Sequence, residues 1–167
     1  PAGADIGDEH YVFQLTKDNF CWKISNWSKN AYNACLSITI LPTIFSSFLA
    51  IHDEYVYKLL FPLIFSPTAV GIYLFSKRYV EEKLSFIAAF FFITQTWLIF
   101  EITTNARNEI SFYFFNLVLL ILFNEHISLI LKEILFLVFG FSMVISHYST
   151  TYIALALFIF IYLNCYI

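Results

Sequence analysis

Long apolar runs separated by short polar breaks dominate this chain, after a mixed stretch at residues 1–33. The runs that are membrane-spanning candidates, or nearly long enough to be, lie at residues 59–76, 84–100, 110–123, 127–145 and from 152 onward. An α-helix rises about 1.5 Å per residue, so about 20 apolar residues are needed to cross a hydrocarbon core of about 30 Å. The pattern predicts an all-α fold, a polytopic transmembrane helix bundle of about five membrane-spanning helices. Because residues 110–123 are too few to cross alone, we expect their helix to begin within residues 105–109.

Residues 34–51 form a further apolar run, but hydroxyl side chains and Pro42 interrupt it. Its length allows a thin spanning helix, and its polarity equally allows an interfacial or re-entrant helix that stays on one face. We expect the version that does not cross. The predicted division is therefore an extramembrane loop with an acidic motif at 1–33, an interfacial or re-entrant helix at 34–51, and the helix bundle at 52–167.

Composition supports a membrane protein. Hydrophobic residues make up 60% of the 167 residues and charged residues only 13%, whereas soluble domains carry about 25% charged residues. A net charge of −3 without a basic patch excludes nucleic acid as a partner. We expect a multi-pass protein of the cell membrane with lipid as one partner. The chain lacks an initial Met and stops inside an apolar run, so we expect a fragment that misses the remainder of its own chain at both ends.

Positive charges in the short connections predict the orientation. The connection at residues 77–83 carries Lys77, Arg78 and Lys83, the polar patch at 101–109 carries only Arg107, and the turn at 147–151 carries no Lys or Arg. Cytoplasmic loops are enriched in Lys and Arg. Residues 77–83 should therefore be cytoplasmic, and the 101–109 patch and the 147–151 turn should face outward. Residues 1–33 share the outer face if residues 34–51 do not cross.

The most polar stretch of the chain is also the first, and it contains Asp5, Asp8, Glu9, His10 and Tyr11. A carboxylate can deprotonate an incoming hydroxyl as a general base, or hold a divalent cation on a diphosphate. The plainer alternative is an exposed acidic loop. Asp5, Asp8 and Glu9 are therefore candidate catalytic residues.

A second polar group lies at residues 101–109. Its Glu101, Asn105, Asn108 and Glu109 fall near one helical stripe that continues to Asn116, and Arg107 lies within one turn. Such charges can reach out to water from a helix end, or they can line a cavity within the membrane. His147, at the end of an apolar run, is either structural or a hydrogen-bond donor to phosphate.

Four features follow one another along the chain: Asp8-Glu9-His10-Tyr11 in a long first loop, Tyr32 to Pro42, Tyr73 to Tyr79 at the end of a span, and Asn105-Ala106-Arg107-Asn108-Glu109-Ile110 at the start of a later one. This order resembles the first half of a GT-C-type membrane glycosyltransferase, the group that includes protein mannosyltransferases and oligosaccharyltransferases. More narrowly, it resembles an archaeal-type family of predicted membrane proteins with the same layout.

The resemblance implies a transferase that moves a sugar from a polyprenyl-phosphate donor to an acceptor at the outer membrane face. The essential acid of the first loop would be matched by Asp8-Glu9 with Tyr11 nearby, and Asp5 is a second candidate. The helix after that loop would lie along the membrane surface. Arg107, with His147, would face the donor's phosphate.

The other polar residues would support that site. Glu101 and Glu109 would order Arg107 or bind a cation, and Asn105 and Tyr11 would contact substrate. A Mg²⁺ or Mn²⁺ ion is the one cofactor candidate, but residues 101–109 depart from the family pattern in lacking a clear Asp-x-Asp, which leaves metal dependence open.

The alternative function is a non-enzymatic membrane transporter or scaffold subunit. Transporters commonly show internal repeats and helices interrupted by Gly or Pro. This chain has four Gly and no recognisable repeat, which favours the transferase.

Overall fold

The computed structural model describes residues 4–24 and 30–166, and within them every regular element is helical. The front half of the chain contains α1 (Ala4–Asn19), α2 (Asn30–Asn33), α3 (Ile40–Leu49), α4 (Asp53–Tyr55), the π-helix η1 (Val56–Leu60), α5 (Phe61–Phe65) and α6 (Pro67–Ser76). The back half contains α7 (Glu82–Ile93), α8 (Thr96–Thr104), α9 (Ala106–Leu122), α10 (Leu129–Ser146) and α11 (Tyr148–Tyr166). The predicted all-α class is confirmed.

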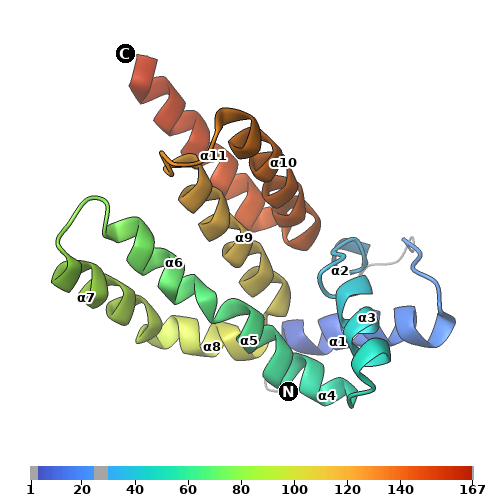
Figure 1. The fold of residues 1–167 in the computed structure, drawn as a ribbon. Helices are drawn as coiled ribbons and strands as arrows, with labels where there is room; N and C mark the ends of the chain where they lie inside the picture. The colour runs from blue at the N-terminus through green and yellow to red at the C-terminus, as the bar shows by residue number, and fades with distance from the viewer. Residues whose placement is uncertain (1–3, 25–29, 167) are drawn as a thin grey trace.

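Helix α9 is the centre of the arrangement and packs against α5, α6, α8, α10 and α11. Figure 1 shows α6 and α7 side by side as a hairpin, with α10 and α11 beside α9 on the other side. Helix α1 lies across the end of this bundle where α9 begins, and α2, α3 and α4 lie around it (Figure 1). The front of the chain and the start of α9 therefore meet.

The front of the chain is a helix, not the loop that we expected. Its buried residues recur at three- and four-residue intervals, which places them on one helical face; they are Ile6, Glu9, Val12, Phe13 and Thr16. Asp5 in the first turn and Lys17 in the last turn also suit the helix macrodipole. Polarity alone suggested a loop because the buried face itself contains Glu9 and Thr16.

Residues 34–51 contain one helix, α3, which is ten residues long. At about 1.5 Å per residue it extends about 15 Å, half of what a spanning helix needs. It ends at Ala50, whose φ of 50° is left-handed. Its buried residues are Pro42 and Ser46, whereas Ile44 and Phe48 are exposed. Its apolar side thus faces away from the protein, and its position on a membrane surface stays a prediction.

Two helical segments among the described residues are long and apolar enough to cross a membrane, Asp53–Ser76 and Leu129–Ser146. Only 22% and 11% of their most apolar stretches are buried within the protein. The core helix of a soluble domain would be mostly covered by protein, so this exposed apolar surface favours contact with lipid. The count of two is smaller than the five spans expected from the apolar runs.

The expected span at residues 84–100 is broken into α7 and α8. Thr94 Oγ1 donates to the carbonyls of Phe90 and Phe91 at 3.0 and 3.1 Å, and Gln95 Nε2 donates to the Phe91 carbonyl at 2.9 Å. Side chains that bond to nearby carbonyls compete with the helical backbone ladder. By contrast, α9 begins at Ala106, inside the 105–109 window that we predicted.

Helices α6 and α9 approach closely at Gly71. Asn116 Nδ2 donates to the Thr68 carbonyl at 3.0 Å, and a Cβ added to Gly71 would lie 2.2 Å from Asn116 Oδ1. Only a residue without a side chain leaves room for this amide. The contact holds the Asp53–Ser76 helix against α9 at Asn116, further along α9 than the end that meets α1.

Candidate functional site

The first turn of α9 receives a carboxylate from α1. Asn105 caps the helix, and its Oδ1 accepts from the Asn108 N–H at 3.4 Å. The Ala106 N–H donates to Glu9 Oε2 at 3.0 Å. N–H groups in a first turn have no partner inside the helix, and the helix start carries partial positive charge. Glu9, at 0% exposure, therefore joins α1 to α9.

Arg107 lies between two acids. Its Nε is 3.3 Å from Glu9 Oε1, and its Nη2 is 3.8 Å from Asp5 Oδ2. The guanidinium carbon lies 4.0 Å from the centre of the Tyr32 ring, a cation–π arrangement. Tyr32 in turn donates its hydroxyl to Asp5 Oδ1 at 2.6 Å. We call Asp5, Glu9, Tyr32 and Arg107 the acid–arginine cluster.

The two acids of this cluster differ in access. The Asp5 side chain is 48% exposed, whereas the Glu9 side chain is 0% exposed. A dissolved or membrane-bound substrate can therefore reach Asp5 directly. Glu9 can act only through Arg107 and through the start of α9.

Burial controls the ionisation of the cluster. Desolvation raises the pKa of Glu9 to about 8, against the opposing effects of Arg107 and of the Ala106 and Arg107 N–H groups. Burial, together with the hydrogen bond to Asp5, raises the pKa of Tyr32 to about 12. Tyr32 therefore keeps its proton at neutral pH and remains a donor to Asp5.

The junction between α10 and α11 lies against the same end of α9. His147 Nδ1 is 2.8 Å from Thr150 Oγ1, and Thr150 Oγ1 donates to Asn108 Oδ1 at 2.7 Å. The Leu36 N–H donates to the Ile145 carbonyl at 2.8 Å, which holds the junction close to the segment after α2. Three segments that are far apart in the sequence thus meet.

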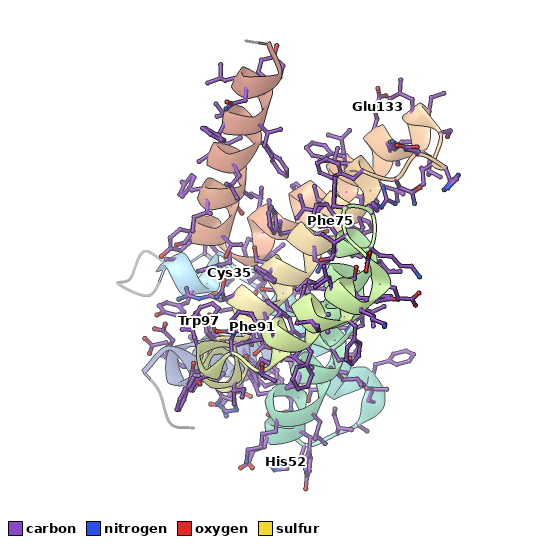
Figure 2. The ribbon with its side chains drawn as sticks, turned by 90° about the vertical axis from the view of Figure 1, so that its left-hand side faces the viewer. Cys35, His52, Phe75, Phe91, Trp97 and Glu133 are labelled. Atoms are coloured by element: carbon purple, nitrogen blue, oxygen red, sulfur yellow. The ribbon has the colours of Figure 1, made fainter. Side chains whose placement is uncertain are left out.

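Figure 2 shows the position of this meeting place within the molecule. His52 and Glu133 lie at opposite ends, and Cys35 lies between them (Figure 2). Cys35 belongs to a buried cluster that includes Ile6 of α1 and Ile110 of α9. Apolar packing therefore lies directly beside the acid–arginine cluster and supports its geometry.

Not every predicted site residue reaches the cluster. Tyr11 is 49% exposed, and Asp8 is half-buried. Helical spacing turns both away from Glu9, since neighbouring positions differ by about 100°. Glu109 is buried and, with Asn108, lines a cavity of about 20 Å³ among apolar side chains. The side chain of Glu101 lies outside the described part of the chain.

Two members of the site were missed by the sequence analysis. Tyr32 appeared only within a longer motif, and its partnership with Asp5 spans 27 positions. Thr150 follows His147 by three positions, a spacing that pairs side chains on a helix and could have indicated the contact. Within residues 4–24 and 30–166, no group of three or more His, Cys, Asp or Glu side chains is placed to hold a metal ion.

Comparisons with known proteins found no matching family model, no matching curated protein and no matching solved structure. Over residues 4–24 and 30–166, fold and site define an all-helical protein with two helices long and apolar enough to cross a membrane, and with a buried Glu–Arg pair at one end of its central helix.

Proposed function

We propose that this chain is part of a GT-C-type membrane glycosyltransferase that transfers a sugar from a polyprenyl-phosphate donor to an acceptor at the outer membrane face. The observation that carries the proposal is the meeting of α1, the start of α9 and the α10–α11 junction around Asp5 and Arg107. In this proposal α7–α8, α9 and α11 also cross the membrane, which brings the number of spans to about five.

Asp5 is the base in this mechanism, because it is the acid of the cluster that substrate can reach. It accepts the proton of the acceptor hydroxyl as that oxygen forms a bond to the anomeric carbon of the sugar. The bond between the anomeric carbon and the phosphate oxygen breaks, and the phosphate leaves with the electron pair. Tyr32 orients the Asp5 carboxylate through its hydrogen bond.

Arg107 compensates the negative charge that develops on the leaving phosphate. Its Nη1 is buried and makes no hydrogen bond with any described residue. Glu9 is a positioning residue, since it accepts from the first turn of α9 and its Oε1 lies 3.3 Å from Arg107 Nε, which donates to Asn105 Oδ1. Arg107 Nη2 also lies 3.8 Å from Asp5 Oδ2, which places the cation beside the base.

The test is Asp5→Asn in the full-length protein, with sugar transfer from a lipid-linked donor as the measurement. Loss of a general base lowers the rate by about 10²- to 10⁴-fold, and we expect a fall in kcat of that size. Asp18→Asn is the matched control, because Asp18 is an exposed acid on the same helix. Equal activity of the two variants would exclude Asp5 as the base.

A scaffold or transporter subunit is the second candidate function. The burial of Glu9 and Arg107, at 0% and 6% exposure, favours it, because their pairing joins α1 to α9 without any ligand. In that case Asp5→Asn would leave transfer unchanged, whereas Glu9→Ala, which removes the whole carboxyl group, would impair folding or assembly.

A further inference from the structure

His147 occupies a one-residue junction between two long helices, and its backbone is fully engaged there. Its N–H donates to the Met143 carbonyl at 3.1 Å, and its own carbonyl accepts from Thr151 N at 3.2 Å and Thr151 Oγ1 at 2.9 Å. The φ and ψ of −154° and 115° are extended, so the chain turns sharply at this residue. The backbone of His147 is therefore held in one place, and the residue is 8% exposed.

The hydrogen bonds around the ring determine which nitrogen carries the proton. A threonine hydroxyl has one hydrogen to donate, and Thr150 donates it to Asn108 Oδ1 at 2.7 Å. The 2.8 Å contact between His147 Nδ1 and Thr150 Oγ1 must then use the hydrogen on Nδ1. The opposite nitrogen, Nε2, is left with a lone pair as long as the ring is neutral.

The surroundings keep the ring neutral at physiological pH. Burial lowers the pKa of His147 to about 4, and the nearby Arg107 lowers it further than Asp5 raises it. None of the described residues donates a hydrogen bond to Nε2. Through Thr150 and Asn108 the ring lies beside the first turn of α9, the turn that contains Arg107.

We propose that His147 Nε2 accepts a hydrogen bond from a hydroxyl group of the ligand, and that His147 does not bind the donor's phosphate. An acceptor lone pair repels the phosphodiester oxygens of a polyprenyl-phosphate-linked sugar, which lack hydrogens at neutral pH, and attracts the hydroxyl groups of a sugar or of an acceptor. The assignment of the ligand as a sugar or acceptor rests on the proposed transferase function. The position of the proton on the ring is independent of that function. His147 is thus a specificity residue that accepts a hydrogen bond. The sequence context had instead suggested that it could be a hydrogen-bond donor to phosphate.

The first test measures the tautomer without any activity assay. The full chain, labelled with ¹⁵N-histidine in detergent, should show His147 at pH 7 with a protonated Nδ1 and an unprotonated Nε2. In Thr150→Val, which removes the hydroxyl that fixes this tautomer, the proton should shift towards Nε2. A wild-type ring that is protonated at Nε2, or at both nitrogens, would overturn the proposal.

The second test identifies the ligand chemistry with two small probes. Methyl α-mannopyranoside carries uncharged hydroxyl groups, and dimethyl phosphate carries the anionic phosphodiester group of the donor without a P–OH hydrogen. We expect the His147 Nε2 resonance to move with the sugar and not with dimethyl phosphate. Movement with dimethyl phosphate alone, or with neither probe, would overturn the proposal.

Kinetics supply a third test in the full-length transferase. One neutral hydrogen bond corresponds to about 3- to 10-fold in affinity, so His147→Leu should raise the KM of one substrate by that factor with little change in kcat. His147→Gln, which can restore an acceptor, should recover part of the loss, and His147→Lys, a donor only, should not. Better function of the lysine variant would contradict the proposal. If the wild-type protein transfers no sugar, the proposed function fails, while the tautomer and probe measurements still decide the role of His147.

Discussion

The buried Glu9–Arg107 pair is the residue-scale feature on which the site depends. Glu9 is enclosed by protein, accepts from the Ala106 N–H and faces Arg107 Nε at 3.3 Å. Removing one partner of such a pair leaves an uncompensated group in a poorly solvated place. The geometry of Arg107, and through it the environment of Asp5, therefore depends on an acid that no substrate can touch.

The ionisation of Glu9 predicts how stability changes with pH. Its folded pKa of about 8 lies above its ordinary value of 4.5, so the stabilisation from the bound proton is present below pH 4.5 and is lost as pH rises through 8. His147 has the opposite sign: its folded pKa of about 4 lies below 6.5, so its contribution is present above pH 6.5 and is lost as pH falls towards 4. The range from pH 6.5 to 8 therefore reports on Glu9.

Over that range we expect the free energy of unfolding in detergent to fall, by at most about 1.4 kcal/mol per pH unit. Glu9→Gln is the control, because its amide does not titrate and its slope should be close to zero. Equal slopes in the wild-type protein and in Glu9→Gln would show that Glu9 does not carry the buried proton.

A double-mutant cycle tests the pairing itself. For Glu9→Gln and Arg107→Met, measured singly and together at pH 8.5, we expect a coupling energy of about 1–3 kcal/mol, because the two groups share one buried contact. The exposed pair Lys58 and Glu54, 3.0 Å apart and in one helix, is the matched control, and its coupling should be close to the limit of measurement. Additive effects of Glu9 and Arg107 would contradict the contact.

The sequence identified Asp5, Asp8 and Glu9 as candidate catalytic acids, but it could not predict which of them is buried and which is accessible. Asp5, Asp8 and Glu9 look equivalent in a loop, and only the helical geometry of α1 places Glu9 inside and leaves Asp8 half-buried. The role of Tyr32 was beyond prediction because its contacts with Asp5 and Arg107 depend on the path of the chain between α1 and α2. The sequence thus predicted which types of residue the site contains, but not which of them contact one another.

At the scale of elements, the contact between α6 and α9 yields a stability prediction. Gly71→Ala would place a Cβ 2.2 Å from Asn116 Oδ1 and displace an amide that bonds to the Thr68 carbonyl. Overpacking of this kind destabilises by about 1–3 kcal/mol, and we expect that loss in the free energy of unfolding. Gly140→Ala is the matched control, since nothing lies within 4 Å of its added Cβ. A Gly71→Ala variant as stable as Gly140→Ala would refute this packing.

Apolar runs predicted most helices correctly but not their continuity. The start of α9 was predictable because residues 110–123 were too short alone and a capping Asn105 preceded them. The break between α7 and α8 was not, since it depends on how Thr94 and Gln95 bond to the carbonyls before them. Helix α1 was missed because its buried face contains polar residues that join it to α9 rather than to a purely apolar core.

At the scale of the whole molecule, the helix ends separate into two groups. The connection between α6 and α7 lies at the end of α6 away from α1, whereas the start of α9 lies beside α1 (Figure 1). The α10–α11 junction lies with the second group, through Thr150 and Asn108. This separation matches the arrangement inferred from charges, in which the connection bearing Lys77, Arg78 and Lys83 opposes the acidic front of the chain.

Sided labelling of single cysteines tests this arrangement, and with it the site, most directly. Cys21 is exposed and carries a free thiol, and it serves as one probe. Ser149→Cys reports the α10–α11 junction and Val80→Cys the basic connection, each in a background without the other cysteines. With a membrane-impermeant maleimide on intact cells, we predict labelling at positions 21 and 149, and labelling at position 80 only after permeabilisation. Labelling of positions 21 and 149 from opposite sides, or of positions 21 and 80 from the same side, would contradict a site shared by α1, α9 and the α10–α11 junction.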